Sequence, residues 1–382
     1  DGWSSHYTTI YVDQRDMPFL VDSLRMALNR WGLNIYTLQS NPVWALRNDL
    51  GTIEGIHSDY VENADREALM IIEVDLLSDR EIEELQRELT LVLDDVSTVV
   101  DSFDPMRMRL ELLIAELKTN APKVEQLDES LAFLQWIYDG YFVFTGCAEF
   151  DLEVKDESVY LREKAGSAYG LLKKYRGDLR KESVEELSDG VKGLYEDDQI
   201  LTVTKSAKRS KVHRNVYSDY IVVKRFNSDG DPVGEIRFLG LYTAQFYSYS
   251  PRRIPILREK VGWVMENSGF NPASHDGKAL LTILDSHPRD ELLHVTREVL
   301  AATAIGVWQI YERRVVKVFV HTDPFNKFVS CLVYLPRESF NTNTRDKIEE
   351  KIGLELGAVE SELTTHFIPD SVLVRIRLEI GR

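Results

Sequence analysis

The residues best suited to bind a small molecule lie between Asp13 and Asp22, where a strand-like run gives way to a helix-like one. The first amides of a helix are unpaired and carry the positive end of the helix dipole, so they can receive a carboxylate. Aspartate side chains beside them can receive an ammonium group. The candidate effector-binding residues of this junction are Asp13, Asp16, Met17, Phe19 and Asp22.

The same junction has a simpler, structural interpretation. Asp16 has the side chain of a helix N-cap, and Pro18 suits the first helical turn, where its missing N–H costs nothing. Phe19 would then belong to the core or to an interface. Both interpretations place the start of a helix close to Asp16.

A second candidate is a basic island in a chain whose formal net charge is −17. It consists of Lys205, Lys208, Arg209, Lys211 and Arg214, with His213 among them. Such a cluster can bind a phosphate, a nucleotide effector or an acidic neighbour. The island spans a predicted turn, however, and exposed charges contribute little on their own, so a solvated turn or an interdomain contact is the simpler explanation.

Other chemistries lack the residues they need. Hydride transfer to NAD requires a glycine-rich turn between a strand and a helix, and no G-x-G-x-x-G occurs; Gly166 and Gly170 in GSAYG are the nearest imitation and predict a flexible loop. Cys147 and His213 both lie in strand-like runs, where nothing lowers the thiol pKa, so we expect a buried structural cysteine. The eight histidines show no HxH or HxxxH spacing for a metal. We therefore expect no catalytic, cofactor-binding or metal-binding residues in this chain.

Composition narrows the class of protein. A chain of 382 residues predicts two to three domains, and its acidity disfavours nucleic acid and membrane as partners. Only Cys147 and Cys331 are present, which fits a reducing compartment, and the first residues lack the pattern of a secretory signal, so we expect a cytoplasmic protein. The absence of an initiator Met and the ending directly after a strand suggest a piece of a longer protein.

Strand and helix patterns alternate over residues 6–96 in the order β-α-β-β-α, with the first helix ending at Gly32. This alternation is typical of ferredoxin-like α+β modules, in which two helices cover one face of an antiparallel sheet. Prolines 105 and 122 delimit a charged helical connector. The following strand patterns predict a central antiparallel sheet with small helices, over Tyr141–Glu153, Ser158–Arg162, Ile200–Lys205, Lys211–Phe226 and Pro232–Tyr242; residues 166–198 predict loops and short helices.

Near the C-terminus, Val315–Pro336 predicts a hairpin whose first strand places Val316, Val318 and Val320 on one face. The turn at Asp323–Asn326 contains a proline and an aspartate suited to a type I turn. We predict a long amphipathic helix before the hairpin, over Arg289–Tyr311, and a helix and two strands after it. The resulting order repeats the alternation of residues 6–96, shifted by one element.

The hairpin segment HTDPFNKFVSCLVYLPRESFNTNTR closely resembles part of the large bacterial NAD-specific glutamate dehydrogenases. The resemblance extends to Asp16–Ser23, Leu134–Leu152, Val212–Phe226 and Ser268–Leu292, and so covers essentially the whole chain. It implies an α+β, multi-domain chain: an ACT-like module at 1–104, a helical connector at 105–130, a PAS-like module at 131–250, a helical linker at 251–288 and a second ACT-like module at 289–382.

The resemblance also implies a function. The parent enzyme would deaminate glutamate oxidatively to 2-oxoglutarate and ammonia with NAD, while this N-terminal part would bind no cofactor and serve regulation and assembly. Its partners would be its own subunits in a homo-oligomer, the missing catalytic domain and an amino-acid effector, with a purely structural assembly arm as the alternative. ACT modules commonly bind amino acids beside the first β-α loop, although they often carry glycine where Phe19 stands here.

Overall fold

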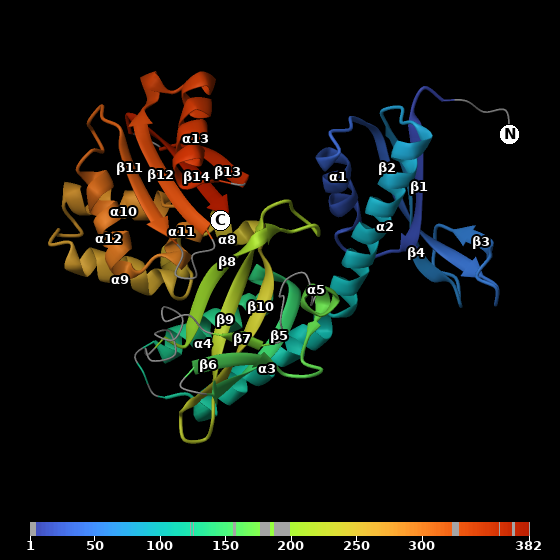
Figure 1. Cartoon of the computed structure of the whole chain (residues 1–382), viewed down its shortest axis with the longest axis horizontal. Coiled ribbons are helices and arrows are strands. Elements are labelled where there is room, and N and C mark those ends of the chain that lie inside the picture. Colours follow the sequence, from blue (N-terminus) through green and yellow to red (C-terminus); the bar gives the residue numbers. More distant parts are fainter. Residues whose placement is uncertain are drawn as a thin grey trace. The chain divides into compact units, whose positions relative to one another are not determined.

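The computed structural model describes residues 5–122, 124, 126–155, 158–175, 184–186, 199–322, 328–358, 360–368 and 371–381. The chain forms two compact units (Figure 1). The N-terminal unit comprises Asp1–Phe103 together with Arg209–Val216, and the C-terminal unit comprises Asp104–Lys208 and Tyr217–Arg382. Within the described residues, no helix is long and apolar enough to cross a membrane. The predicted α+β class with antiparallel sheets is confirmed.

The N-terminal unit is an antiparallel sheet with two helices on one face. Its strands, in the order β1-β4-β2-β3, are β1 (Thr8–Arg15), β2 (Ile35–Arg47), β3 (Ile53–His57) and β4 (Asp65–Val74). Helices α1 (Leu20–Arg30) and α2 (Asp79–Asp101) pack against each other and bury Leu24, Leu28, Val92 and Val96. A capping box between Ser78 and Glu81 begins α2, and Gly32, at φ 71°, ends α1 as predicted.

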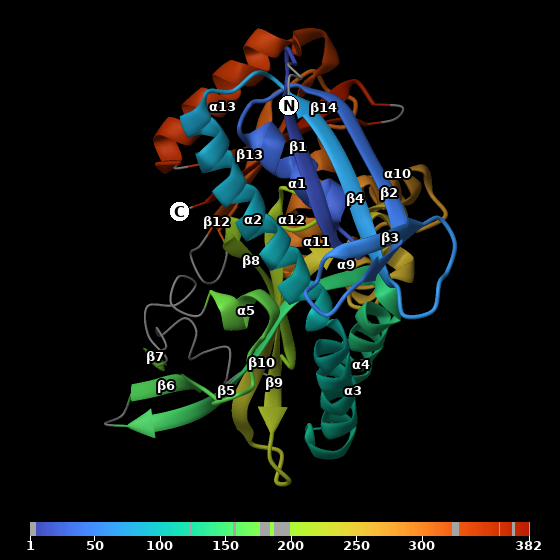
Figure 2. The same ribbon diagram turned by 90° about the vertical axis from the view of Figure 1, so that its right-hand side faces the viewer.

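The C-terminal unit begins with α3 (Phe103–Asn120), α4 (Leu127–Trp136) and a π-helical turn at Ile137–Tyr141. Its larger sheet has the order β7-β6-β5-β10-β9-β8. The strands are β5 (Phe142–Lys155), β6 (Ser158–Glu163), β7 (Val184–Glu186), β8 (Leu201–Arg209), β9 (Tyr217–Phe226) and β10 (Pro232–Tyr242). Helices α3 and α4 share one hydrophobic core with this sheet, and the short α5 (Gly170–Lys174) packs beside β5 (Figure 2).

One part of this region differs from the prediction, and another lies partly outside the described residues. The strand predicted for Lys211–Phe226 was wrong at its start, because residues 210–216 form a loop in which His213 has φ 69°. Of the stretch 166–198, residues 176–183 and 187–198 lie outside the described residues. The predicted β9–β10 turn is confirmed: the Asn227 side chain accepts hydrogen bonds from the amides of Asp229 and Asp231.

Helices then connect the two sheets of this unit. They are the short α8 (Ala244–Ser248), α9 (Leu257–Asn267), α10 (His275–Ser286), α11 (Arg289–His294) and α12 (Arg297–Trp308). The single helix predicted for Arg289–Tyr311 was wrong, since Val295 is extended and Thr296 begins a new helix by accepting a hydrogen bond from the Val299 amide. Asp290 and Glu291 of α11 contact the second sheet of the unit, at Arg377 and Ser330 respectively.

The second sheet contains the predicted hairpin. Strands β11 (Lys317–Thr322), β12 (Phe328–Pro336), β13 (Glu360–Phe367) and β14 (Leu373–Gly381) are antiparallel in the order β11-β12-β14-β13. The predicted turn at Asp323–Asn326 lies outside the described residues. Strand β12 is buried on both faces: Val329, Cys331 and Val333 pack toward α13 (Thr342–Leu356), whereas Leu332 and Tyr334 join the large core.

Candidate functional site

At the first β-α junction, the helix begins differently from the prediction. Phe19, not Asp16, is the N-cap of α1; it has φ 73°, which is rare for a residue with a side chain, and makes no side-chain capping bond. Asp16 was therefore wrongly predicted as the N-cap. Its carboxylate lies 2.8 Å from Nε of Arg66 on β4, because the end of β1 runs beside that strand.

The remaining candidates on this side are held in the sheet or in the core. Asp13 lies 2.6 Å from Arg47, whose guanidinium also binds Glu67 at 2.6 Å and the carbonyl of Gly51. These carboxylates raise the pKa of Arg47, Glu67 most strongly, so the cation is firmly retained. Met17 is buried. Neither Asp13 nor Asp16 is left without a cation to neutralise it.

Phe19 and Asp22 instead meet the Arg209–Val216 loop, which belongs to the same compact unit. The rings of Phe19 and His213 lie 5.0 Å apart, and Nδ1 of His213 lies 3.5 Å from the Asp22 carboxylate. The backbone amide of His213 donates a 3.0 Å hydrogen bond to the hydroxyl of Ser23, which is fully buried. The two sequence candidates, junction and basic island, thus meet at one place.

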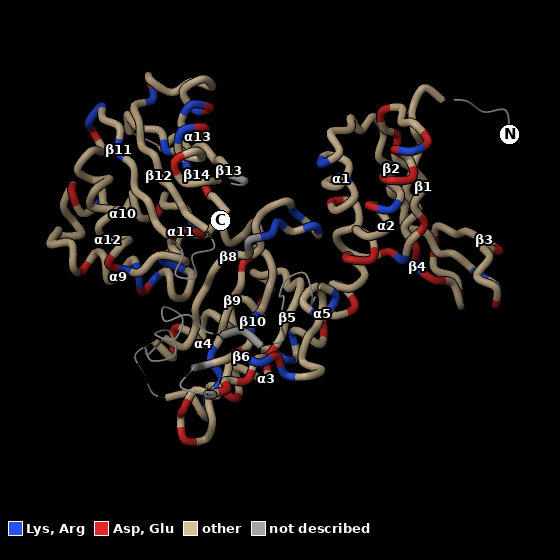
Figure 3. The backbone as a smooth tube through the Cα atoms, viewed as in Figure 1, with Lys and Arg blue, Asp and Glu red and all other residues tan. Residues whose placement is uncertain are grey.

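The basic island does not stay together in the fold. Lys208 and Arg209 are the last residues of β8, and Lys211 and Arg214 lie in the loop between β8 and β9, where Figure 3 shows blue segments along the tube. Arg209 donates to the carbonyl of Asn215, which closes the loop on itself. Lys205, in contrast, is buried and belongs to a separate network within the C-terminal unit.

That network brings several buried or nearly buried charges together in the C-terminal unit. Lys205 on β8 lies 3.1 Å from Asp219 on β9 and 3.6 Å from Asp290 on α11. Arg377 on β14 lies 3.1 Å from the other oxygen of Asp290 and also pairs with Glu379. The network therefore connects the large sheet, a connecting helix and the second sheet through one carboxylate.

Two further groups surround Asp290. Tyr247 donates a 3.2 Å hydrogen bond to it, and His294 lies 3.5 Å from Asp219. Burial alone would raise the pKa of Asp290, but Lys205, Arg377 and His294 outweigh it and hold the pKa below the ordinary value. Asp219 and Asp290 in turn overcome burial and keep the pKa of Lys205 above its ordinary value. The charged forms are thus mutually maintained.

Next to this network lies a cleft of about 440 Å³, a size typical of small-molecule sites. Its walls come from α4, the start of β8, α9 and the α11–α12 connection; its lining residues include Glu129, Leu201, Glu259, Lys260, His294 and Arg297. The ammonium of Lys260 donates to the carbonyls of Leu292, Leu293 and Val295 at 2.8–3.0 Å. Burial lowers the pKa of Lys260 to about 8, while these carbonyls satisfy all three of its donors.

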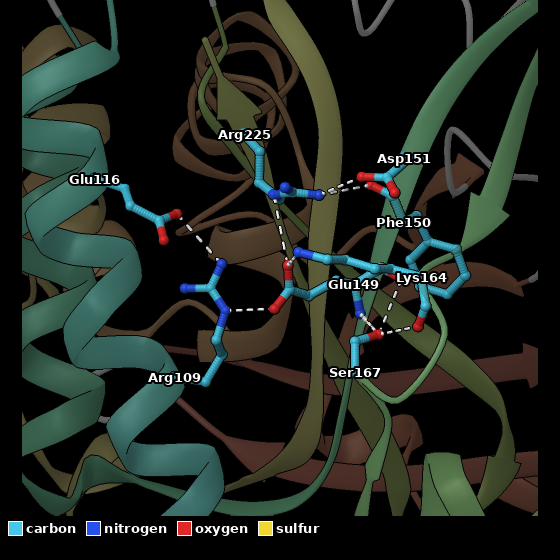
Figure 4. Close-up of polar contacts among 8 residues, drawn as sticks. All are labelled: Arg109, Glu116, Glu149, Phe150, Asp151, Lys164, Ser167 and Arg225. Carbon is cyan, nitrogen blue, oxygen red and sulfur yellow. Dashed lines mark hydrogen bonds and ion pairs between the residues drawn. The ribbon is translucent and has the colours of Figure 1, made fainter. Parts of the chain in front are cut away.

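A second charged cluster fastens α3 to the large sheet (Figure 4). Oε1 of the buried Glu149 accepts a 2.5 Å hydrogen bond from Arg109 of α3, and its other oxygen faces Lys164 at 3.5 Å and Arg225 at 3.6 Å. Arg225 also binds Asp151 at 2.7 Å. Cations and carboxylates are matched here, and we interpret the cluster as structural.

Sequence reasoning missed Lys260, Asp290, His294 and Arg377. A signal for part of the network does exist in β14, where Arg375, Arg377 and Glu379 alternate with Val374, Ile376 and Leu378. Charges at every second position normally mark an exposed face. Here that face is buried against other elements of the unit, and only the tertiary structure reveals the carboxylates that neutralise it.

His287 leads to a prediction about pH. Its imidazole is buried, neither ring nitrogen has a hydrogen-bond partner, and burial together with Arg375, Arg377 and Arg289 places its pKa well below the usual value. Because the folded state disfavours the protonated ring, stability is lost as the pH falls below about 6.5, by about 1.4 kcal/mol per pH unit. Asp290 titrates at lower pH, since its pKa is depressed.

Urea unfolding at pH 7.5 and pH 5.5 tests this prediction. The wild-type chain should lose about 1 kcal/mol more free energy of unfolding between the two pH values than His287→Leu. Equal losses in the two proteins would contradict the assignment.

Other candidate chemistry finds little support. Cys147 and Cys331 are free and buried; burial raises the pKa of both thiols, that of Cys331 to about 11, which makes a nucleophilic role unfavourable. Over the residues that the structure describes, no group of three or more His, Cys, Asp or Glu side chains is arranged to hold a metal ion.

Comparison with known proteins assigns most of these elements. Residues 1–89 match the family model of the glutamate dehydrogenase ACT1 domain, residues 254–313 that of glutamate dehydrogenase helical motif 1, and residues 317–382 that of the glutamate dehydrogenase ACT2 domain. Asp290 and His294 thus lie in the helical motif, and Arg377 lies in the ACT2 domain.

Curated relatives match nearly the whole chain. The NAD-specific glutamate dehydrogenase of Halomonas elongata is 38% identical over 98% of this chain, and that of Pseudomonas aeruginosa is 34% identical over 98%. The protein of the same name from Mycobacterium tuberculosis is 27% identical over 90%. The chain spans about a quarter of the length of these relatives, 24%, 23% and 20% respectively. It therefore belongs to the glutamate dehydrogenase family and carries the ACT1 domain, helical motif 1 and ACT2 domain of these enzymes.

Proposed function

We propose that this chain is the regulatory and assembly region of a large NAD-dependent glutamate dehydrogenase. The whole protein would deaminate L-glutamate to 2-oxoglutarate and ammonia, with NAD bound elsewhere in the cytoplasmic enzyme. The observation that carries the proposal is the succession of ACT1, helical motif 1 and ACT2 matches along a chain without a dinucleotide-binding glycine motif. The strand order β6-β5-β10-β9-β8 supports a PAS-like module between them.

The cleft beside Lys260 is the place where we propose that an amino-acid effector binds. It is lined by carboxylates such as Glu259, which could receive the ammonium group of an amino acid, and by the guanidinium of Arg297, which could receive its carboxylate. It also borders the Asp290 network, which connects helical motif 1 with ACT2 and the large sheet. A ligand in the cleft would thereby contact the elements whose relative positions that network sets.

Isothermal titration of the chain with glutamate, aspartate, arginine and other amino acids tests the sensor function. We expect heat for at least one of them, reduced by Glu259→Gln in the cleft and unchanged by Asp22→Asn at the first β-α junction. No heat for any amino acid would refute effector binding and leave the assembly function. Incubation with glutamate and NAD checks the other half of the proposal: NADH formation above a blank would show that this chain is itself catalytic.

The alternative function is that of a purely structural assembly arm with no ligand, and one specific observation supports it. Strand β11 is an edge of its sheet. Val318 and Val320 on its outer face are 47% and 58% exposed, and Val316, just before the strand, is 63% exposed. An exposed edge with apolar side chains normally needs to be covered. We propose that a second copy of the chain covers it.

This proposal predicts an effect of mutation on assembly. Val318→Lys should shift the mass of the chain in solution toward the monomer, because it places a charge in the apolar contact. Thr364→Lys on β13, the opposite edge strand, should leave the mass unchanged. Analytical ultracentrifugation of the three proteins decides the matter; a wild-type chain that is already monomeric would exclude pairing through β11.

A further inference from the structure

The Arg209–Val216 loop reaches the first β-α junction in a shape that its own hydrogen bonds set. The Ser210 hydroxyl donates to the carbonyl of Val212 and accepts from the Val212 amide, and the Ser210 amide donates to the carbonyl of Val216. Val212 is fully buried. The loop is therefore pre-organised, which reduces the entropy that docking costs.

Its contacts with the junction combine packing, polarity and backbone strain. The amide of His213 reaches the hydroxyl of Ser23, a polar group with no exposed surface, and its ring packs on Phe19. His213 and Phe19 have φ values of 69° and 73°, a conformation that costs about 1–3 kcal/mol for a residue other than glycine. Two strained residues that face each other keep these backbone conformations only when the surrounding contacts hold both of them in place.

The electrostatics of this contact favour a neutral ring. Burial and Arg214 lower the pKa of His213 from its ordinary value, while Asp22, 3.5 Å away, opposes the shift. A groove beside this contact is lined by Asp22, His213 and Arg214 together with Arg25 and Arg30 of α1, and Arg30 is paired with Glu88. The Asp22 carboxylate thus faces His213 in a groove that is also lined by arginines of α1 and of the loop.

We propose that the Arg209–Val216 loop is the resident ligand of the first β-α junction and keeps it closed to free amino acids. The partner that this surface fits is a short basic peptide segment of the same chain, which supplies a backbone N–H to Ser23, a ring to Phe19 and a cationic neighbourhood to Asp22. Asp13 and Asp16, the other acidic groups of the junction, are already neutralised by Arg47 and Arg66. This inference concerns the ACT1 domain and does not depend on the effector proposed for the cleft.

Hydrogen exchange of the full chain tests this proposal, with two variants and a matched control. Ser23→Ala removes the acceptor of the His213 amide, and His213→Gly removes the ring while allowing the positive φ. Lys211→Gln changes an exposed side chain of the same loop. Loss of the hydrogen bond should accelerate exchange at residues 211–215 about fivefold in Ser23→Ala, and His213→Gly should accelerate it as well. Lys211→Gln should leave it unchanged.

A second measurement examines closure directly. With millimolar glutamate, aspartate or arginine, the amides of Phe19–Ser23 should gain protection in Ser23→Ala or His213→Gly but not in the wild-type chain. Equal protection in wild type and variants would overturn the proposal, because it would mean that the loop and an amino acid do not compete. Unchanged loop exchange in both variants would overturn it too, since the loop would then not be held by these contacts. Protection in neither variant would also overturn it, since the opened junction would not accept an amino acid.

Discussion

Asp290→Asn is expected to lower the free energy of unfolding of the C-terminal unit by about 3–5 kcal/mol. The substitution keeps the shape of the side chain but removes the charge that Lys205 and Arg377 face at 3.6 and 3.1 Å. Lys205 is buried and the Arg377 side chain is only 11% exposed, so each loses one of its carboxylates in a place where water cannot replace it. Arg377 retains Glu379 and Lys205 retains Asp219, so we expect the unit to remain folded in water.

Asp285→Asn provides the control, because Asp285 pairs with Arg252 at the surface, where such a pair is worth at most about 1 kcal/mol. Urea unfolding, with hydrogen exchange at β14 to identify the transition, measures both variants. A loss below 1 kcal/mol for Asp290→Asn would mean that the network relaxes around the missing charge. A double-mutant cycle that combines Asp290→Asn with Lys205→Met should give a coupling free energy of about 1–3 kcal/mol, since the two side chains are in contact.

The pH dependence gives Asp290 a separate signature. Its pKa is depressed in the folded chain, so the stabilisation it provides is present above the ordinary carboxyl pKa of about 4 and is lost as the pH falls further. Asp290→Asn should therefore lose less stability in acid than the wild-type chain. This window lies below that of His287, which separates the two groups experimentally.

Gly170→Ala is expected to destabilise the C-terminal unit by about 3–4 kcal/mol. Gly170 has φ 59°, and a Cβ there would lie 2.3 Å from the carbonyl oxygen of Thr145. The backbone of β5 approaches Gly170 this closely because Gly146 and Gly170 form a β-bridge. The new methyl group must therefore separate two backbones, and the residue must also adopt a left-handed conformation.

Gly166→Ala, four residues earlier, is a matched control. Gly166 has φ 76°, but no atom lies within 4 Å of the position of its Cβ, so only the backbone cost of about 1 kcal/mol remains. Urea unfolding of the two variants should show a clear difference. Similar costs would mean that β5 and α5 can separate easily.

These two glycines also show what the GSAYG segment does. Its spacing imitates a fragment of a phosphate-binding motif, yet Gly170 begins the five-residue helix α5 directly against β5. The close approach to a neighbouring strand explains the glycine without a ligand. Spacing alone could not separate these possibilities, because both require a residue without a side chain.

Local rules determined much of the fold from the sequence. Alternation predicted β11, β12 and their antiparallel pairing, and the glycine at position 32 marked the end of α1, because each of these features depends on a few neighbouring residues. Local rules failed at Asp16 and at Thr296. The Asp16 carboxylate pairs with Arg66, on a strand far away in the sequence, instead of capping the helix. Thr296 does cap a helix, but the apolar residues on both sides of it suggested one continuous helix.

The sequence by itself therefore determined the class of fold, most of the strands and, through its resemblance, the family. Only the tertiary structure decided which charged side chains are buried and which partners they contact. It divided the basic island, burying Lys205 beside Asp219 and Asp290 and bringing His213 to Phe19 and Ser23. The physical reason is that an ion pair or a docked loop depends on partners that are far apart in the chain, and composition and periodicity report only on neighbours.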